Sequence, residues 1–215
     1  MNISLLQSLI EIVFLTIVFL HIAKKNITAV LAYEIQSLAI VAILFYSFFE
    51  TKSFSLLFVA LLALTVKGIL APIFFVRLIK KHKLTFLVST YVNTPLTLII
   101  IAVLTAIANS NTFAPLTKII PANQILLSFA LSTMILSFFL IVNRKGALSQ
   151  IIGILSLENS IVAFTIFAGL EQSASLQIGI IFDIFVWLII ATVFVSMIYK
   201  HFGSLDVTSM KTLKD

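Results

Sequence analysis

Five ionisable side chains lie inside stretches of this sequence that are otherwise apolar. They are Glu11, Glu34, Lys67, Glu158 and Asp183. A charged side chain at the centre of a bilayer costs roughly 2.5–3.5 kcal/mol on insertion scales, so such residues normally have a partner, a water-filled cavity or a proton to transfer. Burial disfavours a charged carboxylate and a nearby lysine favours it, so moving one proton changes the preferred state of its neighbour. These five residues are therefore candidates for a proton path.

Each candidate also has a structural interpretation. A carboxylate can pair with Lys67, or with a basic residue of a neighbouring subunit, only to hold an assembly together. For Glu158 we favour the proton path, whereas for Glu34 and Lys67 both interpretations stay open. Glu11 and Asp183 fit structural or subunit-interface groups better.

The composition excludes a soluble domain. Hydrophobic residues make up 61% of the chain and charged residues 10%, against about 45–50% and about 25% in soluble domains. The net charge of +6 does not indicate nucleic-acid binding, because the basic residues stand at the ends of apolar runs, where topology determinants are found. With no cysteine and three scattered histidines, we expect no metal, no cofactor and no catalytic centre in this chain. His82 is interpreted as a solvated neighbour of lysines.

A membrane-spanning helix needs about 20 mostly apolar residues. This criterion predicts an all-α, polytopic bundle of about seven transmembrane helices. The predicted ranges are 3–22, 27–49, 53–76, 86–108, 123–143, 146–170 and 176–199. Together they form a single transmembrane domain over residues 1–199, followed by a short cytoplasmic tail over 200–215.

The basic clusters predict the orientation of the chain. Lys/Arg clusters follow the first, third, fifth and seventh ranges, whereas the other connections carry at most one lysine. Because basic residues favour the cytoplasmic side, the N-terminus is predicted outside and the C-terminus inside. The first six residues contain no basic region and no cleavage site follows, so we expect the first span to be retained.

A helix interruption is predicted within the third range, at Gly68 and Pro72. Pro72 has no amide N–H, so the carbonyl of Gly68 loses its α-helical partner. Such backbone is tolerated at membrane depth only where protein or water satisfies it. Lys67 stands beside the interruption, so a simple packing kink and a functional break both stay open.

Small residues recur on one side of the range 146–170. Ser149, Gly153, Ser156, Ser160 and Ala163 follow one another at spacings of four, three, four and three residues. At about 100° per residue they form one narrow stripe, and such stripes allow close helix packing in lipid. Glu158 points to the opposite side. This helix is therefore predicted to be interior, with protein or water on both sides.

The stretch from Asn143 to Asn159 resembles the hydrogenase-4 component E family, which has an Arg-Lys loop, a Gln-x-x-Gly and a Leu-Glu-Asn motif. Here these motifs are residues 144–145, 150–153 and 157–159. The resemblance continues through 177–183 and the tail 202–215, and upstream through 67–72 and 93–95. Ser160 replaces an expected glycine, and Gln177 stands where an acidic residue is common.

The resemblance implies a non-redox membrane subunit of a group 4 NiFe-hydrogenase or formate hydrogenlyase-like complex in a prokaryotic inner membrane. The family is similar to the K subunit of complex I and the C subunit of Mrp-type antiporters, whose buried glutamates lie on a proton path. Glu158 matches the Leu-Glu-Asn glutamate, Lys67 the lysine before the intramembrane proline, and Glu34 the first buried glutamate of K-type subunits.

The partners implied by the resemblance are antiporter-like and other membrane subunits of a hydrogenase- or complex-I-like oxidoreductase. The translocated ion is then a proton or sodium. Two alternatives stay open: a purely structural spacer of the same complex, and an independent small transporter. A transporter of this size favours a clear internal repeat, and the sequence shows only a weak one.

Overall fold

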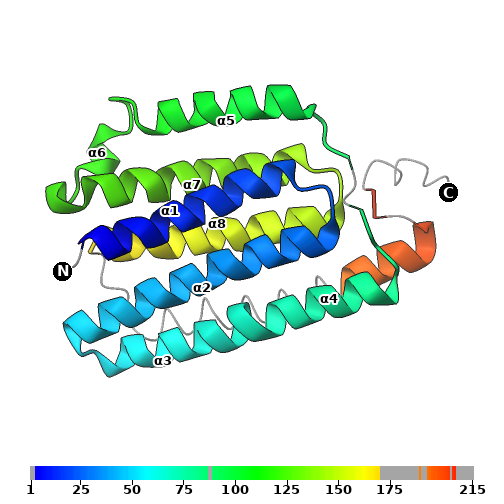
Figure 1. Ribbon diagram of the computed structural model, residues 1–215, viewed down its shortest axis with the longest axis horizontal. Coiled ribbons are helices and arrows are strands. Elements are labelled where there is room, and N and C mark those ends of the chain that lie inside the picture. The colour runs from blue at the N-terminus through cyan, green and yellow to red at the C-terminus, as the bar shows by residue number, and fades with distance from the viewer. Residues whose placement is uncertain (1–2, 87–88, 170–188, 190–192, 204, 207–215) are drawn as a thin grey trace.

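The computed structural model describes residues 3–86, 89–169, 189, 193–203 and 205–206. Regular structure in these residues is helical, with isolated backbone bridges but no strand. Long helices lie side by side and run alternately in opposite directions (Figure 1). Five of them are long and apolar enough to cross a membrane. An all-α fold of the membrane type is confirmed, while the number of seven spans and the orientation stay predictions.

The first two helices agree with the predicted ranges. Helix α1 covers Ile3–Ile22 and α2 covers Asn26–Thr51. Helix α2 ends at Lys52, which adopts a left-handed conformation with φ 54° and donates its amide to the carbonyl of Phe48 at 2.7 Å. A left-handed residue after the last turn is a common way to satisfy the end of a helix.

The third segment is longer than predicted and changes helix type in its middle. Helix α3 (Phe54–Ala63), a π-helical segment η1 (Leu64–Leu70) and α4 (Ala71–Lys81) follow without a break. The helix therefore continues past residue 76, where the predicted range ends. Leu78 is still buried on the core side of α4, and Lys80 and Lys81 in its last turn interact favourably with the helix dipole.

The predicted span 86–108 is also wrong in its first part. Helix α5 covers only Thr94–Ala108, because Asn93 accepts a hydrogen bond from the amide of Leu96 at 3.0 Å and Pro95 occupies the first turn. At 1.5 Å per residue, its 15 residues span about 22 Å, less than the roughly 30 Å of a hydrocarbon core. Among the described residues before it, Phe86 and Thr90 form backbone bridges with Lys25 and Arg144.

The remaining helices complete the described bundle. A short α6 (Ala114–Thr117) and a 3-10 turn η2 (Pro121–Asn123) occupy the predicted loop. Helix α7 covers Gln124–Asn143 and α8 covers Ala147–Phe167. Helix α8 ends before residue 170 because Gly169 turns left-handed, with φ +60°. Residues 193–202 are helical, whereas Asp183, most of the range 176–199 and residues 207–215 lie outside the described residues.

The packing order places α2 and α8 at the centre of the described bundle. Helix α8 packs against α7 and α2, α1 packs against α2 and α7, and α5 covers α7 (Figure 1). Segments η1 and α4 pack against the other side of α2. Large apolar side chains such as Leu15, Phe54 and Phe138 are exposed on the outside, as expected for a surface that faces lipid.

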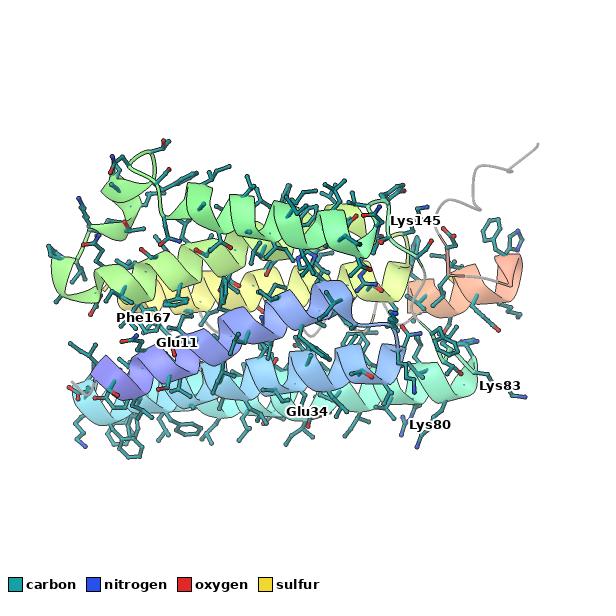
Figure 2. The ribbon with its side chains drawn as sticks, turned by 45° about the horizontal axis from the view of Figure 1, so that its top comes forward. Glu11, Glu34, Lys80, Lys83, Lys145 and Phe167 are labelled. Carbon is teal, nitrogen blue, oxygen red and sulfur yellow. The ribbon has the colours of Figure 1, made fainter. Side chains whose placement is uncertain are left out.

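The basic clusters gather at one end of the bundle. The α1–α2 connection, the end of α4 and the α7–α8 connection meet there, joined by the bridges of Lys25 and Arg144. Lys80, Lys83 and Lys145 lie at this end (Figure 2). We call it the basic end.

Candidate functional site

Lys67 and Glu158 form a buried ion pair between η1 and α8. The side chain of Lys67 is 2% exposed, and its ammonium contacts a carboxylate oxygen of Glu158. Glu158 is 17% exposed, but both of its carboxylate oxygens are buried, so the exposed part is the hydrocarbon stem. The Lys67 ammonium also donates a hydrogen bond to Oδ1 of Asn159 at 2.9 Å. Two residues that the sequence places in separate helices thus share one site.

Asn159 extends this site across the centre of the bundle. Its Nδ2 donates to Oγ of Ser37 at 3.1 Å and to Oε1 of Gln36 at 3.4 Å. Nε2 of Gln36 in turn donates to the carbonyl of Val13 in α1 at 3.5 Å. Asn159, Gln36 and Ser37 are fully buried. A continuous polar network therefore links η1, α8, α2 and α1 inside an otherwise apolar core.

The π-helical segment carries Lys67 and takes the place of the predicted interruption. The amide of Ala71 donates to the carbonyl of Val66, one residue further back than in an α-helix. Pro72 lies in the first turn of α4, where a missing amide is tolerated. Short π-helical segments within α-helices frequently occur at functional sites.

Gly68 lies where η1 contacts α2. A Cβ atom at this position would lie 3.2 Å from Cδ1 of Leu64 and 3.4 Å from Cδ2 of Leu38 in α2. Helix α4 also contacts α2, and the rings of Tyr33 and Phe75 meet edge to face there, with centroids 6.1 Å apart. Gly68 thus lies beside Lys67 at a position with little room for a larger side chain.

The stripe of small residues on α8 faces the protein interior. Its members Ser149, Gly153, Ser156, Ser160 and Ala163 are all buried. A Cβ atom on Gly153 would lie only 2.8 Å from Cγ1 of Ile141, so α7 packs directly on the stripe. Glu158, on the other side of α8, reaches Lys67. Helix α8 thus has protein on both sides, in agreement with the expectation from the sequence.

The buried Glu158 carboxylate retains free hydrogen-bonding capacity. Apart from the contact with Lys67, no described group donates a hydrogen bond to the Glu158 carboxylate. Buried polar atoms are usually satisfied, so unsatisfied ones next to an ion pair mark a site that can accept a proton or a water molecule.

Glu11 and Glu34 do not join this network within the described residues. Glu11 is half-buried on α1 and accepts a hydrogen bond from Nε2 of Gln7, one turn away, at 2.9 Å. Glu34 is half-buried on α2, and no hydrogen bond or ion pair to another described residue involves it. Figure 2 labels both residues. Asp183 lies outside the described residues, so its relation to the network stays a prediction.

Glu34 lies within an apolar stripe on the outer face of α2. The stripe consists of Ile27, Leu31 and Leu38, which are 40%, 51% and 44% exposed. At about 100° per residue, Glu34 projects between these side chains. Its carboxylate therefore belongs to the outer surface of the described chain.

Sequence reasoning missed the structural role of Arg144, which we interpreted only as a topology determinant. Arg144 is buried, and its Nη2 donates to the carbonyls of Leu20, His21 and Ala23 at the end of α1. Burial lowers the pKa of Arg144 to about 10. The signal that could have revealed this role is the donor-rich guanidinium group next to a helix end with free carbonyls.

His21, in the last turn of α1, is likewise buried. Its Nε2 lies 3.1 Å from the carbonyl of Leu136, and its ring stacks on Phe139 with centroids 5.0 Å apart. Together with Arg144 it ties the end of α1 to α7. This contact holds the basic end together and lies away from the Lys67–Glu158 pair.

Within the described residues, no group of three or more His, Asp or Glu side chains could hold a metal ion. The polar site is therefore built from one lysine, one glutamate and neutral amides and hydroxyls. Comparison of the chain with protein-family models, curated proteins and solved structures finds no match.

Proposed function

We propose that the chain is a non-redox membrane subunit of a hydrogenase- or complex-I-like complex, and that Lys67 and Glu158 lie on its ion path. The observation that supports this most is the buried Lys67–Glu158 pair with its extension through Asn159 to α2. Electron transfer would take place in other subunits, and this chain would couple it to movement of protons or sodium across a prokaryotic inner membrane.

The chemistry of the pair suits a relay. Removing one charge from a buried ion pair leaves the other uncompensated, which is strongly unfavourable. A proton that arrives at Glu158 therefore disfavours the charged form of Lys67, and a proton that leaves reverses the effect. Asn159 accepts a hydrogen bond from the Lys67 ammonium and donates to Gln36 and Ser37. A change in the charge of Lys67 would therefore alter the hydrogen bonds of Asn159 to α2.

The outward carboxylate supports contact with another membrane subunit. Glu34 lies in an apolar stripe, and a charged side chain that faces lipid is costly. A neighbouring helix with a basic or amide side chain at this depth would remove that cost. The antiporter-like subunits implied by the family resemblance are the proposed partners.

A structural spacer is the second candidate, and the ion pair itself favours it. Lys67 bound to both Glu158 and Asn159 ties η1 to α8, which would suffice to hold the bundle together. The spacer and the relay differ in one respect: only the relay requires the charge state of Glu158 to change.

Purification of a tagged chain from its native membrane in a mild detergent tests membership in a complex. The proposal predicts that a large NiFe subunit, an iron–sulfur subunit and antiporter-like subunits are purified with it. A chain that runs alone or as a homo-oligomer would instead support an independent transporter. The Glu158→Gln variant is expected to retain the same companions as the natural chain, whereas a spacer would lose them.

A further inference from the structure

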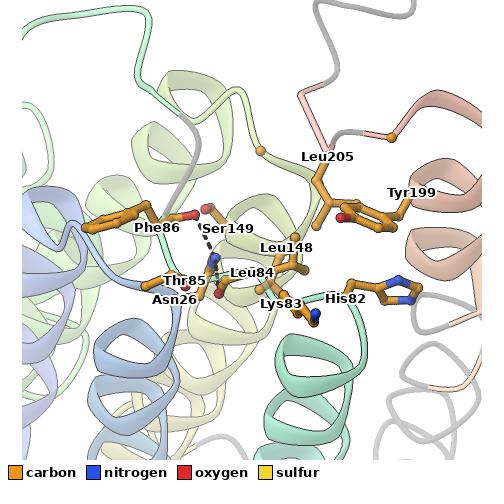
Figure 3. A pocket seen from close by; sticks show the side chains of 12 residues that line it. Asn26, His82, Lys83, Leu84, Thr85, Phe86, Leu148, Ser149, Tyr199 and Leu205 are labelled. Atoms are coloured by element: carbon orange, nitrogen blue, oxygen red, sulfur yellow. Dashed lines mark hydrogen bonds between the residues drawn. The ribbon is translucent and has the colours of Figure 1, made fainter.

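A pocket of about 420 Å³ opens at the basic end, between the start of α8, the end of α4 and the helical residues 193–202 (Figure 3). Small-molecule sites range from about 300 to 1,000 Å³. Its described lining is Asn26, His82, Lys83, Leu84, Thr85, Phe86, Gly146, Leu148, Ser149, Tyr199, Gly203 and Leu205. This lining includes a lysine and a histidine but no carboxylate.

Ser149 places an unused hydrogen-bonding group at this pocket. Its side chain is 5% exposed, and its hydroxyl is buried without a partner among the described residues. By contrast, the side chain of Asn26 is engaged, since its Nδ2 donates to the carbonyls of Leu84 and Phe86 (Figure 3). A buried hydroxyl without a partner is unfavourable, so a ligand that forms a hydrogen bond with the Ser149 hydroxyl would be stabilised by it.

The start of α8 adds two backbone donors beside this hydroxyl. The amide of Ala147 donates to the carbonyl of Leu205, and the amide of Gln150 to that of Gly146. The amides of Leu148 and Ser149 donate to no acceptor within the described residues. Helix α8 has 21 residues, and the start of a long helix favours negative charge through its free N–H groups and its dipole.

Positive charge completes the site. Lys83 lines the pocket, and Lys80 and Lys81 precede it in the last turn of α4. Asp206 pairs with Gly146 through the backbone, but it is not among the lining residues. The Ser149 hydroxyl, the two free amides of Leu148 and Ser149, and the Lys83 ammonium form a set of donors that suits the oxygen atoms of a phosphate group.

We propose that this pocket binds a phosphate group, with the Ser149 hydroxyl and the Leu148 and Ser149 amides as donors and Lys83 as the counter-charge. The basic end of a membrane protein faces the anionic lipid surface when it lies on the cytoplasmic side. The headgroup of an anionic phospholipid is therefore one source of the phosphate, and a free phosphate ion is the other.

Native mass spectrometry of the purified full-length chain, titrated with phosphatidylglycerol or phosphatidylcholine, tests the proposal. We expect phosphatidylglycerol to bind about tenfold more tightly, corresponding to about 1.4 kcal/mol. Ser149→Ala combined with Lys83→Gln should abolish most of this preference. Lys118→Gln is the matched control, because Lys118 is exposed in the connection before α7. Removal of the unpartnered Ser149 hydroxyl should leave the fold intact.

Inorganic phosphate distinguishes the two sources. If the ligand is a free anion, millimolar phosphate should bind the natural chain in neutral lipid and displace phosphatidylglycerol, and the double variant should bind neither. If phosphate has no effect while the lipid preference depends on Ser149 and Lys83, the source is the lipid. The proposal is overturned if the double variant keeps the lipid preference, or if Lys118→Gln loses as much of it.

Discussion

Lys67 in the π-helical segment and Glu158 in α8 form an ion pair whose charged atoms are buried. Asn159, the neighbour of Glu158, accepts a second hydrogen bond from the same ammonium. The π-helical segment thus supplies the lysine, and two adjacent residues of α8 supply the carboxylate and the amide that bind it.

Replacement of Lys67 by Met should destabilise the protein by about 3–5 kcal/mol, because it leaves the Glu158 carboxylate buried and uncompensated. The double variant Lys67→Met and Glu158→Leu should recover much of this loss. Chemical unfolding in detergent, followed by circular dichroism, measures both. Lys52→Met, at an exposed position, is the control; an equal loss in the control would show that the ion pair has no special role.

Replacement of Gly153 by Ala should destabilise the α7–α8 contact by about 1–3 kcal/mol, the usual cost of overpacking. The added Cβ would lie 2.8 Å from Cγ1 of Ile141 and 3.3 Å from its backbone nitrogen, which cannot easily move. Gly68→Ala meets the flexible end of Leu64 at 3.2 Å and should cost less. Thermal unfolding of the two variants side by side checks the order, and the reverse order would contradict the packing described for α8.

Arg144→Met should destabilise the protein by about 2 kcal/mol, since hydrogen bonds to charged donors contribute roughly 1.5–3 kcal/mol. The substitution would leave the carbonyls of Leu20, His21 and Ala23 without their guanidinium donor. Lys145→Met is the matched control, because the Lys145 ammonium only lies over the ring of Tyr91 at 5.0 Å. Hydrogen exchange at the end of α1 should increase in Arg144→Met alone. Unchanged exchange there would refute the capping role.

Phosphate binding at the basic end should strengthen as the pH falls below about 6.5. Burial and the nearby Lys81 lower the pKa of His82 below its usual 6.5, so His82 is neutral at pH 7 and gains its charge only in acid. The other groups near it are the hydroxyl of Ser196, at 3.4 Å, and the ring of Tyr199.

One added charge at a partly exposed site contributes up to about 1 kcal/mol, so affinity should rise by about two- to fivefold. Binding titrations between pH 7 and pH 5 check the prediction, and His82→Gln should remove the pH dependence. In the absence of ligand, acidification acts on the folding stability, and its effect is unfavourable. Because the folded state holds the His82 proton more weakly than the unfolded state, stability should fall slightly with acidification.

The sequence predicted the elements that depend on apolar length alone. Helices α1, α2, α7 and α8 lie where long apolar runs end in polar residues. Helix α5 was mispredicted because the Asn93 cap and Pro95 fix its start regardless of the apolar residues before them. Helix α4 likewise continues beyond its apolar run, and Leu78 in this last part is buried.

The candidate site was predictable as residue types but not as contacts. Burial of Lys67 and Glu158 followed from their positions in apolar runs, yet their pairing depends on how η1 and α8 pack against α2. The link through Asn159 to Gln36 and Ser37 joins residues far apart in the chain, and helical periodicity carries no information about it. Glu11 and Glu34 share the same apolar context, but only packing shows that they lie outside the network.

Redox-driven proton uptake by the whole complex in sealed vesicles tests the central claim most directly. The comparison is between the natural chain, Glu158→Gln and the control Glu11→Gln, with electron transfer measured in the same samples. The relay predicts that Glu158→Gln keeps its subunits but loses most proton uptake per electron, whereas Glu11→Gln behaves as the natural chain. Unchanged proton uptake in an intact Glu158→Gln complex would contradict the assignment of Glu158 to the ion path.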